Sequence, residues 1–150
     1  AEKIKSNISN KYGPTVIVSG DDLRKIFNFK KFSKKDRLSY ALLYCKFCKC
    51  ITDNKINIIL STVSLFHKVR KWNRTNISNY MEIYIQSDIN KIIKQKNKFF
   101  YKKNYKNIIG KDIKPEFPQS SHITIKNNFN KSIIVLTKCL IKKINKIIKL

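Results

Sequence analysis

The sequence has few acidic residues and very few glycines. Nine aspartates and glutamates stand against 33 lysines and arginines, which gives a formal net charge of +24. An excess of this size opposes a compact isolated fold and favours a polyanionic partner. The three glycines leave few tight turns, and neither G-x-x-x-x-G-K-[ST] nor G-x-G-x-x-G occurs. A glycine-rich phosphate-binding loop is therefore not predicted.

Long apolar runs are also lacking. The longest, residues 56–66 (INIILSTVSLF), is about half of the roughly 20 residues that a membrane-spanning helix needs. No secretory signal opens the chain, which begins with Ala1, so either a presequence has been removed or the sequence starts late. Four cysteines without a secretory signal indicate a reducing compartment rather than a disulfide framework.

Three residue types dominate what is present, namely lysine (29), isoleucine (25) and asparagine (16). An AT-rich coding sequence produces this skew and explains the preference for lysine over arginine, but it explains the scarcity of acids only in part. The hydrophobic content of 42% argues against a wholly disordered basic tail. We expect a chain that folds fully only against its partner.

Local patterns predict several elements in the first part of the chain. Residues 14–19 (PTVIVS) read as a strand, followed by a helix that Ser19, Asp21 and Asp22 would cap. Residues 33–36 (SKKD) fit a capping box ahead of another helix. Further helices are predicted over 52–72 and, more loosely, over 78–106.

The predicted fold class is α+β, with a basic and mainly helical N-terminal region over 1–108. Residues 109–121 hold one glycine and two prolines and read as a linker. Residues 122–150 would form a β-hairpin and an amphipathic tail, because two β-branched runs, ITI and SIIVLT, flank the polar segment KNNFNK. In the tail, residues 139–150, apolar side chains follow helical spacing opposite lysines. A terminal strand is the alternative there.

Groupings typical of enzymes are missing from the sequence. His67 and His122 have no carboxylate near them in the chain, and the nine acids show no paired spacing, so no catalysis and no cofactor are predicted. A zinc site through Cys45, Cys48, Cys50 and His67 is the alternative, because C-x-x-C is a common half-site. The favoured interpretation is three small, partly buried thiols, since a second matched pair is absent.

Cations interleaved with aromatic residues occur in three stretches, 25–35, 67–74 and 94–107. Lysine and arginine neutralise phosphates, rings stack on unpaired bases and asparagines bond to base edges. The alternative is a solvated lysine-rich face whose rings turn inward. The candidate RNA-binding residues, including those of the 122–137 segment, are Lys30, Lys31, Lys34, Lys35, Arg70, Lys71, Trp72, Arg74, Lys98, Lys102, Lys103, Lys126, Asn128, Asn130 and Lys131.

Residues 123–137 (ITIKNNFNKSIIVLT) resemble the first hairpin of the universal small-subunit ribosomal protein eleven family. The family pattern I-x-I-[KHQ]-x-x-F-N-N-T-I-[IV]-x-[IL]-T is met at most positions, but Lys131 and Ser132 depart from it. The resemblance implies a structural constituent of the small ribosomal subunit, mitochondrial or of another organelle. Its partners would be rRNA, neighbouring ribosomal proteins and a second polypeptide that supplies the missing C-terminal half of the fold.

Two other functions stay open from the sequence. The cationic helix at 139–150 would suit a membrane-surface or protein-docking module. The cysteine cluster would suit a small zinc-stabilised DNA-binding protein.

Overall fold

A computed structural model describes residues 1–63, 66–94, 107, 109 and 112–148. The chain divides into two compact units, Ala1–Tyr80 (unit 1) and Met81–Leu150 (unit 2). This division does not test the linker predicted at residues 109–121, which stays a prediction. Within the described ranges, none of the helices combines the length and the apolar character that crossing a membrane requires.

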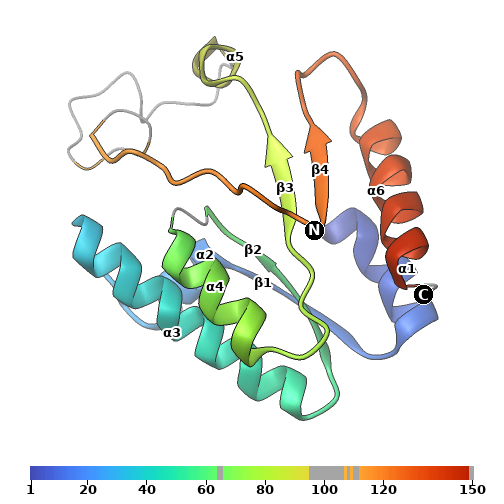
Figure 1. Ribbon diagram of the computed structural model, residues 1–150, viewed down its shortest axis with the longest axis horizontal. Coiled ribbons are helices and arrows are strands. Elements are labelled where there is room, and N and C mark those ends of the chain that lie inside the picture. Colours follow the sequence, from blue (N-terminus) through green and yellow to red (C-terminus); the bar gives the residue numbers. More distant parts are fainter. Residues whose placement is uncertain (64–65, 95–106, 108, 110–111, 149–150) are drawn as a thin grey trace. The chain divides into compact units, whose positions relative to one another are not determined.

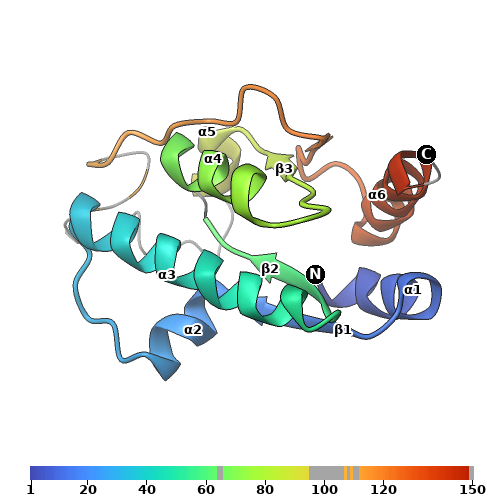
Figure 2. The ribbon, with the colours of Figure 1, turned by 60° about the horizontal axis from the view of Figure 1, so that its bottom comes forward.

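Unit 1 is built on two parallel strands joined through helices (Figure 1). In chain order its elements are α1 (Glu2–Tyr12), β1 (Thr15–Ser19), α2 (Gly20–Ile26), α3 (Lys34–Asp53), β2 (Asn57–Ser61) and α4 (His67–Asn76). Strands β1 and β2 pair in parallel along their whole length, and α2 and α3 form the crossover that such a pair needs. Helix α1 contacts both strands, α3 contacts β2, and α4 lies beside α3 (Figure 2).

The local signals at the start of unit 1 are confirmed. Strand β1 forms where the β-branched run predicts it. The Ser19 hydroxyl accepts a hydrogen bond from the Asp22 backbone N–H at 3.0 Å and caps α2. At α3 both halves of the capping box are present, since the Ser33 hydroxyl accepts from the Asp36 N–H and the Asp36 carboxylate accepts from the Ser33 N–H. These bonds satisfy N–H groups that a helix start leaves without intrahelical partners.

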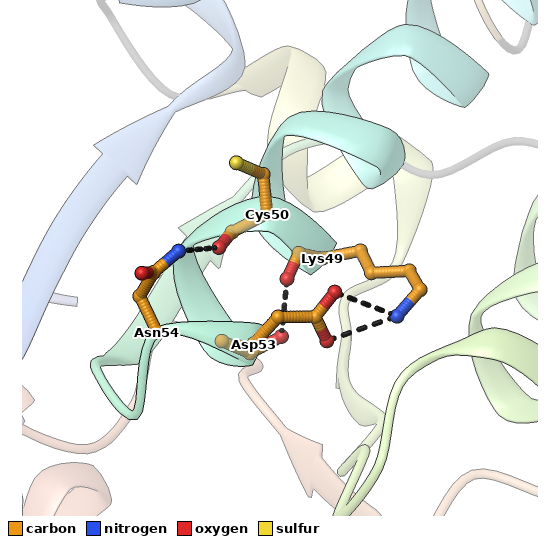
Figure 3. A network of polar contacts seen from close by, with 5 residues as sticks. Lys49, Cys50, Asp53 and Asn54 are labelled. Atoms are coloured by element: carbon orange, nitrogen blue, oxygen red, sulfur yellow. Dashed lines mark hydrogen bonds and ion pairs between the residues drawn. The ribbon is translucent and has the colours of Figure 1, made fainter.

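The single helix predicted over 52–72 is wrong. Helix α3 ends at Asp53, the chain turns at Lys55 with a φ of 64°, and β2 and α4 follow. Side chains close the end of α3, where the Asn54 amide donates to the Cys50 carbonyl at 2.8 Å and the Lys49 ammonium pairs with Asp53 (Figure 3). The apolar run beyond this turn becomes a strand because its isoleucines pair with β1.

Unit 2 contains a second pair of parallel strands. Its described elements are β3 (Ile83–Gln86), α5 (Ile89–Lys94), β4 (Ile123–Lys126) and α6 (Ile133–Ile148). β3 and β4 run in register from Ile83 opposite Ile123, and α6 packs on β4. The helix predicted over 78–106 is therefore wrong at its start, where β3 forms. Only α5 is helical there, and residues 95–106 lie outside the described part of the chain.

The predicted β-hairpin is also wrong, and so is the α+β fold class. The first run of the proposed hairpin is β4, but it pairs in parallel with β3, and the second run is the start of α6. The β-branched residues of this second run enter a helix because the helical spacing of apolar side chains continues from there to Ile148. The cationic helix predicted over 139–150 is confirmed for residues 139–148, which belong to α6, and residues 149–150 lie outside the described part of the chain. Both units are α/β arrangements with parallel strands.

Candidate functional site

The carboxyl ends of β1 and β2 lie level with each other, with Ser19 opposite Ser61. In open α/β folds, ligands bind outside the carboxyl ends of parallel strands. The chain leaves β1 through Gly20, where an added Cβ would lie 2.8 Å from the Thr62 hydroxyl oxygen. A larger residue here would press on the Thr62 side chain, so glycine favours the close approach of the two strand ends. The side chains that follow Gly20 start at this edge.

Four side chains, from α2, from the connection that follows it and from the first turn of α3, form a group that we call the arginine–phenylalanine cluster: Asp21, Arg24, Phe32 and Arg37. The Arg24 guanidinium pairs with the Asp21 carboxylate at 2.7 Å. The Arg24 and Arg37 guanidinium carbons lie 5.5 and 5.4 Å from the centroid of the Phe32 ring. The Arg37 Nε–H also donates to the Phe32 carbonyl at 3.1 Å. Two cations thus share one aromatic ring, an arrangement that cation–π attraction stabilises.

The electrostatics of the cluster favour an anion. Burial, and after it the positive charge of Arg24, lowers the pKa of Arg37, so the two guanidinium groups repel each other. Asp21 supplies one negative charge against the two positive ones. A bound anion between the arginines would reduce this repulsion, and the planar guanidinium fork matches phosphate oxygens.

The exposure of Phe32 adds a second kind of recognition. Its side chain is 40% exposed, so one part of the ring is accessible to a ligand while the guanidinium groups cover another. Aromatic rings stack on nucleobases, and guanidinium groups bind the phosphates attached to them. The arrangement can therefore bind a nucleotide.

Sequence reasoning missed this cluster. It assigned Asp21 to helix capping and gave Arg24 and Arg37 no role. The usable signal was the segment SGDDLR directly after a strand, followed by FSKKDR at the start of the next helix. Arg24 comes three positions after Asp21 and Arg37 five positions after Phe32, but 13 positions separate the two arginines in the chain. The chain turns between the two segments at Asn28, where φ is 53°.

The structure spreads the predicted RNA-binding residues over both units. In unit 1, Lys30, Lys31, Lys34, Lys35, Lys71 and Arg74 are exposed, Trp72 is half-buried, and Arg70 is buried with its Nη2 at 2.8 Å from the His67 Nδ1. In unit 2, Lys126, Asn128, Asn130 and Lys131 are exposed, while Lys98, Lys102 and Lys103 lie outside the described residues. No measurement tests RNA contact by these side chains, which stays a prediction.

The candidate zinc ligands are not brought together. Cys45 and Cys48 are buried on α3, and burial raises the pKa of Cys45 to about 11 and that of Cys48 to about 12, which disfavours the thiolate that binds metal. Cys50 is exposed, and only its carbonyl joins the network of Figure 3. Among the residues that the structure describes, no group of three or more His, Cys, Asp or Glu side chains could hold a metal ion.

Comparisons with known proteins converge on kinases. The family model "Adenylylsulphate kinase" matches residues 1–126. The chain is 30% identical over 138 residues to a cytidine diphosphoramidate kinase of Campylobacter jejuni, covering 89% of this chain and 81% of that protein. It is 30% identical over 88 residues to a probable adenylyl-sulfate kinase of Pyrococcus abyssi, covering 58% and 51%.

A solved structure agrees with these matches in fold. The Mycobacterium tuberculosis APS kinase CysC in complex with AMPPNP and APS superposes with a TM-score of 0.83 at 17% identity, covering 97% of this chain and 88% of that one. This likeness identifies the P-loop kinase fold, which is α/β with parallel strands.

These findings overturn the functional predictions from sequence. The ribosomal family, the role in the small subunit, and the partners rRNA, ribosomal proteins and a second polypeptide are wrong, because both relatives are kinases. The relatives and the fold indicate an enzyme, so the prediction of no catalysis is wrong as well. The docking-module and DNA-binding alternatives find no support. The resemblance failed because isoleucine, lysine and asparagine are so frequent that a short pattern is met by chance.

Proposed function

The chain belongs to the adenylylsulphate kinase family, and we propose that it binds the nucleotide acceptor of a phosphoryl transfer at the arginine–phenylalanine cluster. The observation that carries this proposal is the pair of guanidinium groups around one half-exposed ring. Phe32 would stack on the acceptor base, while Arg24 and Arg37 would bind its anionic groups. Asp21 and Arg24 follow the carboxyl end of β1 on α2, a position that suits a ligand site in this kind of sheet.

The first candidate acceptor is cytidine diphosphoramidate, because the relative that matches 89% of the chain carries that name. The second is adenylyl sulfate, which the family model favours. Both molecules combine a base and a ribose with two linked tetrahedral anionic groups. This shared chemistry corresponds to one aromatic ring and two guanidinium groups, so either acceptor fits the cluster.

In the proposed reaction, the γ-phosphoryl group of a nucleoside triphosphate moves to a hydroxyl oxygen of the acceptor. The bond to the β-phosphate oxygen breaks, the nucleoside diphosphate leaves, and the hydroxyl proton passes to a base. Asp21 is our candidate for this base, since Arg24 holds its carboxylate at the strand end. Residues 1–150 contain no G-x-x-x-x-G-K-[ST] motif, so the proposal places only the acceptor on them.

Equilibrium binding tests the proposal directly. The purified protein would be titrated by calorimetry with cytidine diphosphoramidate and adenylyl sulfate, using cytidine and adenosine as controls that lack the anionic groups. We expect one of the two acceptors to bind at least tenfold more tightly than its nucleoside. Equal affinity for acceptors and nucleosides would refute the role of the cluster.

A further inference from the structure

Phe32 lies on the connection between α2 and α3, residues 27–33, and a ring stack fastens this connection to α3. The rings of Phe29 and Tyr40 are parallel, with centroids 3.8 Å apart and an angle of 4° between their planes. Phe29 belongs to the connection and Tyr40 to the second turn of α3. Among the ring pairs measured in the described part of unit 1, this one is the closest.

The neighbouring rings extend this attachment along one face of α3. Tyr44 lies 6.2 Å from Phe29, and Phe47 meets Phe27 edge-on at 6.4 Å. Tyr40, Tyr44 and Phe47 are spaced by four and three residues, so they lie on the same side of the helix. The connection therefore contacts α3 through a row of rings.

The backbone of the connection is bent to make the stack possible. Asn28 adopts the left-handed region, with a φ of 53°, and the Phe29 N–H donates to the Arg24 carbonyl at 2.9 Å. Phe29 is thus tied by its backbone to the residue that covers Phe32 and by its ring to α3. Asparagine tolerates the left-handed region better than most residues. Contacts elsewhere must offset the cost of the left-handed conformation at Asn28, and the stack of the neighbouring Phe29 on Tyr40 is one such contact.

We propose that Tyr40 is a positioning residue for the acceptor site. Its stack with Phe29 holds the connection in the shape that keeps the Phe32 ring and carbonyl against the two arginines. The inference rests on the proposed function, since acceptor affinity is what the correct shape would govern. Tyr40 makes no contact with acceptor in this scheme and acts through Phe29 and Phe32.

The test uses three variants that separate the ring from other properties of the side chain. Tyr40→Phe keeps the stacked ring, whereas Tyr40→Leu keeps apolar bulk without a ring. Phe47→Leu is the matched control, because it removes a ring from the same face of α3 whose measured contact is edge-on with Phe27 at 6.4 Å, whereas Tyr40 stacks on Phe29 at 3.8 Å. Tyr40→Leu should weaken acceptor binding about tenfold, which is the scale of one aromatic pair. Tyr40→Phe should bind like the unmodified protein, and Phe47→Leu should lie within about twofold of it.

A measurement without ligand separates this inference from the proposed function. The Arg37 Nε–H donates to the Phe32 carbonyl, so its NMR signal and its exchange with water report the shape of the connection. Tyr40→Leu should accelerate this exchange at least tenfold, and Tyr40→Phe should not. Unchanged exchange in Tyr40→Leu would overturn the inference. Faster exchange with unchanged acceptor binding would confirm the role of the stack in shaping the connection and would refute the acceptor site itself.

Discussion

Replacing Arg37 perturbs the proposed acceptor site at a residue that contacts both the ring and the carbonyl of Phe32. Its guanidinium lies 5.4 Å from the Phe32 centroid, its Nε–H donates to the Phe32 carbonyl, and it shares the ring with Arg24. Arg37→Ala removes a positive charge next to the place where we put the anionic groups of the acceptor. A hydrogen bond to a charged group contributes about 1.5–3 kcal/mol. The loss of one such bond, about 2 kcal/mol, raises the acceptor Kd roughly 30-fold.

Arg37→Lys refines this expectation. Lysine keeps the charge, but it has neither the planar fork for two phosphate oxygens nor a group that can replace Nε at the Phe32 carbonyl. We expect a Kd between those of the unmodified protein and of Arg37→Ala, raised about 5- to 10-fold. Calorimetric titration with each candidate acceptor measures both variants under one salt concentration, since salt screens such contacts.

Lys35→Ala is the matched control for charge. Lys35 lies in the same first turn of α3 and is exposed, so its removal lowers the net charge equally. The acceptor Kd of Lys35→Ala should stay within about twofold of that of the unmodified protein. If Lys35→Ala weakened binding as much as Arg37→Ala, the overall charge would explain affinity and the cluster would not. Unchanged binding in Arg37→Ala would refute the site outright.

Three further predictions concern stability. Gly20→Ala should lower the free energy of unfolding, measured by urea denaturation, by about 1–3 kcal/mol, as overpacking does. Adding Thr62→Ala to the same chain should restore part of this stability, because the 2.8 Å contact is with the Thr62 hydroxyl. If the double variant were no more stable than Gly20→Ala, the contact would be irrelevant. Ser33→Ala should cost about 1 kcal/mol in the same assay through loss of the capping box, and a change below 0.3 kcal/mol would contradict that role. Burial raises the pKa of Cys45 from 9.0 to about 11 and that of Cys48 from 9.0 to about 12. The stability that the neutral thiols provide is therefore complete below pH 9 and is lost above it, by about 1.4 kcal/mol per thiol and pH unit. Cys45→Ala should flatten the fall in Tm between pH 9 and 10, and an equal fall in Cys45→Ala and in the unmodified protein would disprove this role of the thiol.

The sequence predicted those parts of the fold that short-range chemistry determines. The caps at Ser19 and Ser33 and the strand between Gly13 and Gly20 depend on neighbouring residues only. β2 and β3 were missed because each is a short apolar run of four or five residues, and periodicity alone does not distinguish such a run from part of a helix. The start of α6 was misread because Ile133 and Ile134 favour strands locally, whereas the helical pattern that decides their structure extends 15 residues further.

The acceptor cluster could not be predicted in the same way, because its members meet through the fold. Arg24 and Arg37 come together only after the chain turns at Asn28 and the Phe29–Tyr40 stack fixes the connection. The capping interpretation of Ser19, Asp21 and Asp22 was correct for Ser19, whose hydroxyl accepts from the Asp22 backbone N–H. It also made a second role for Asp21 seem unnecessary, although the structure pairs that carboxylate with Arg24.

The positions of the arginines indicate the kind of ligand more specifically than the total charge does. Only four of the 33 basic residues are arginines, and coding bias favours lysine wherever a positive charge alone is needed. An arginine in such a chain therefore marks a place where the planar guanidinium is difficult to replace. Two of the four, Arg24 and Arg37, share the Phe32 ring, and a third, Arg70, is buried against His67. The +24 charge suggested a large polyanion, but the arginines indicate a small ligand with few, well-placed anionic groups. If Arg24→Lys and Arg37→Lys together left acceptor affinity unchanged, this argument from arginine would fail, even if the total charge still affected binding.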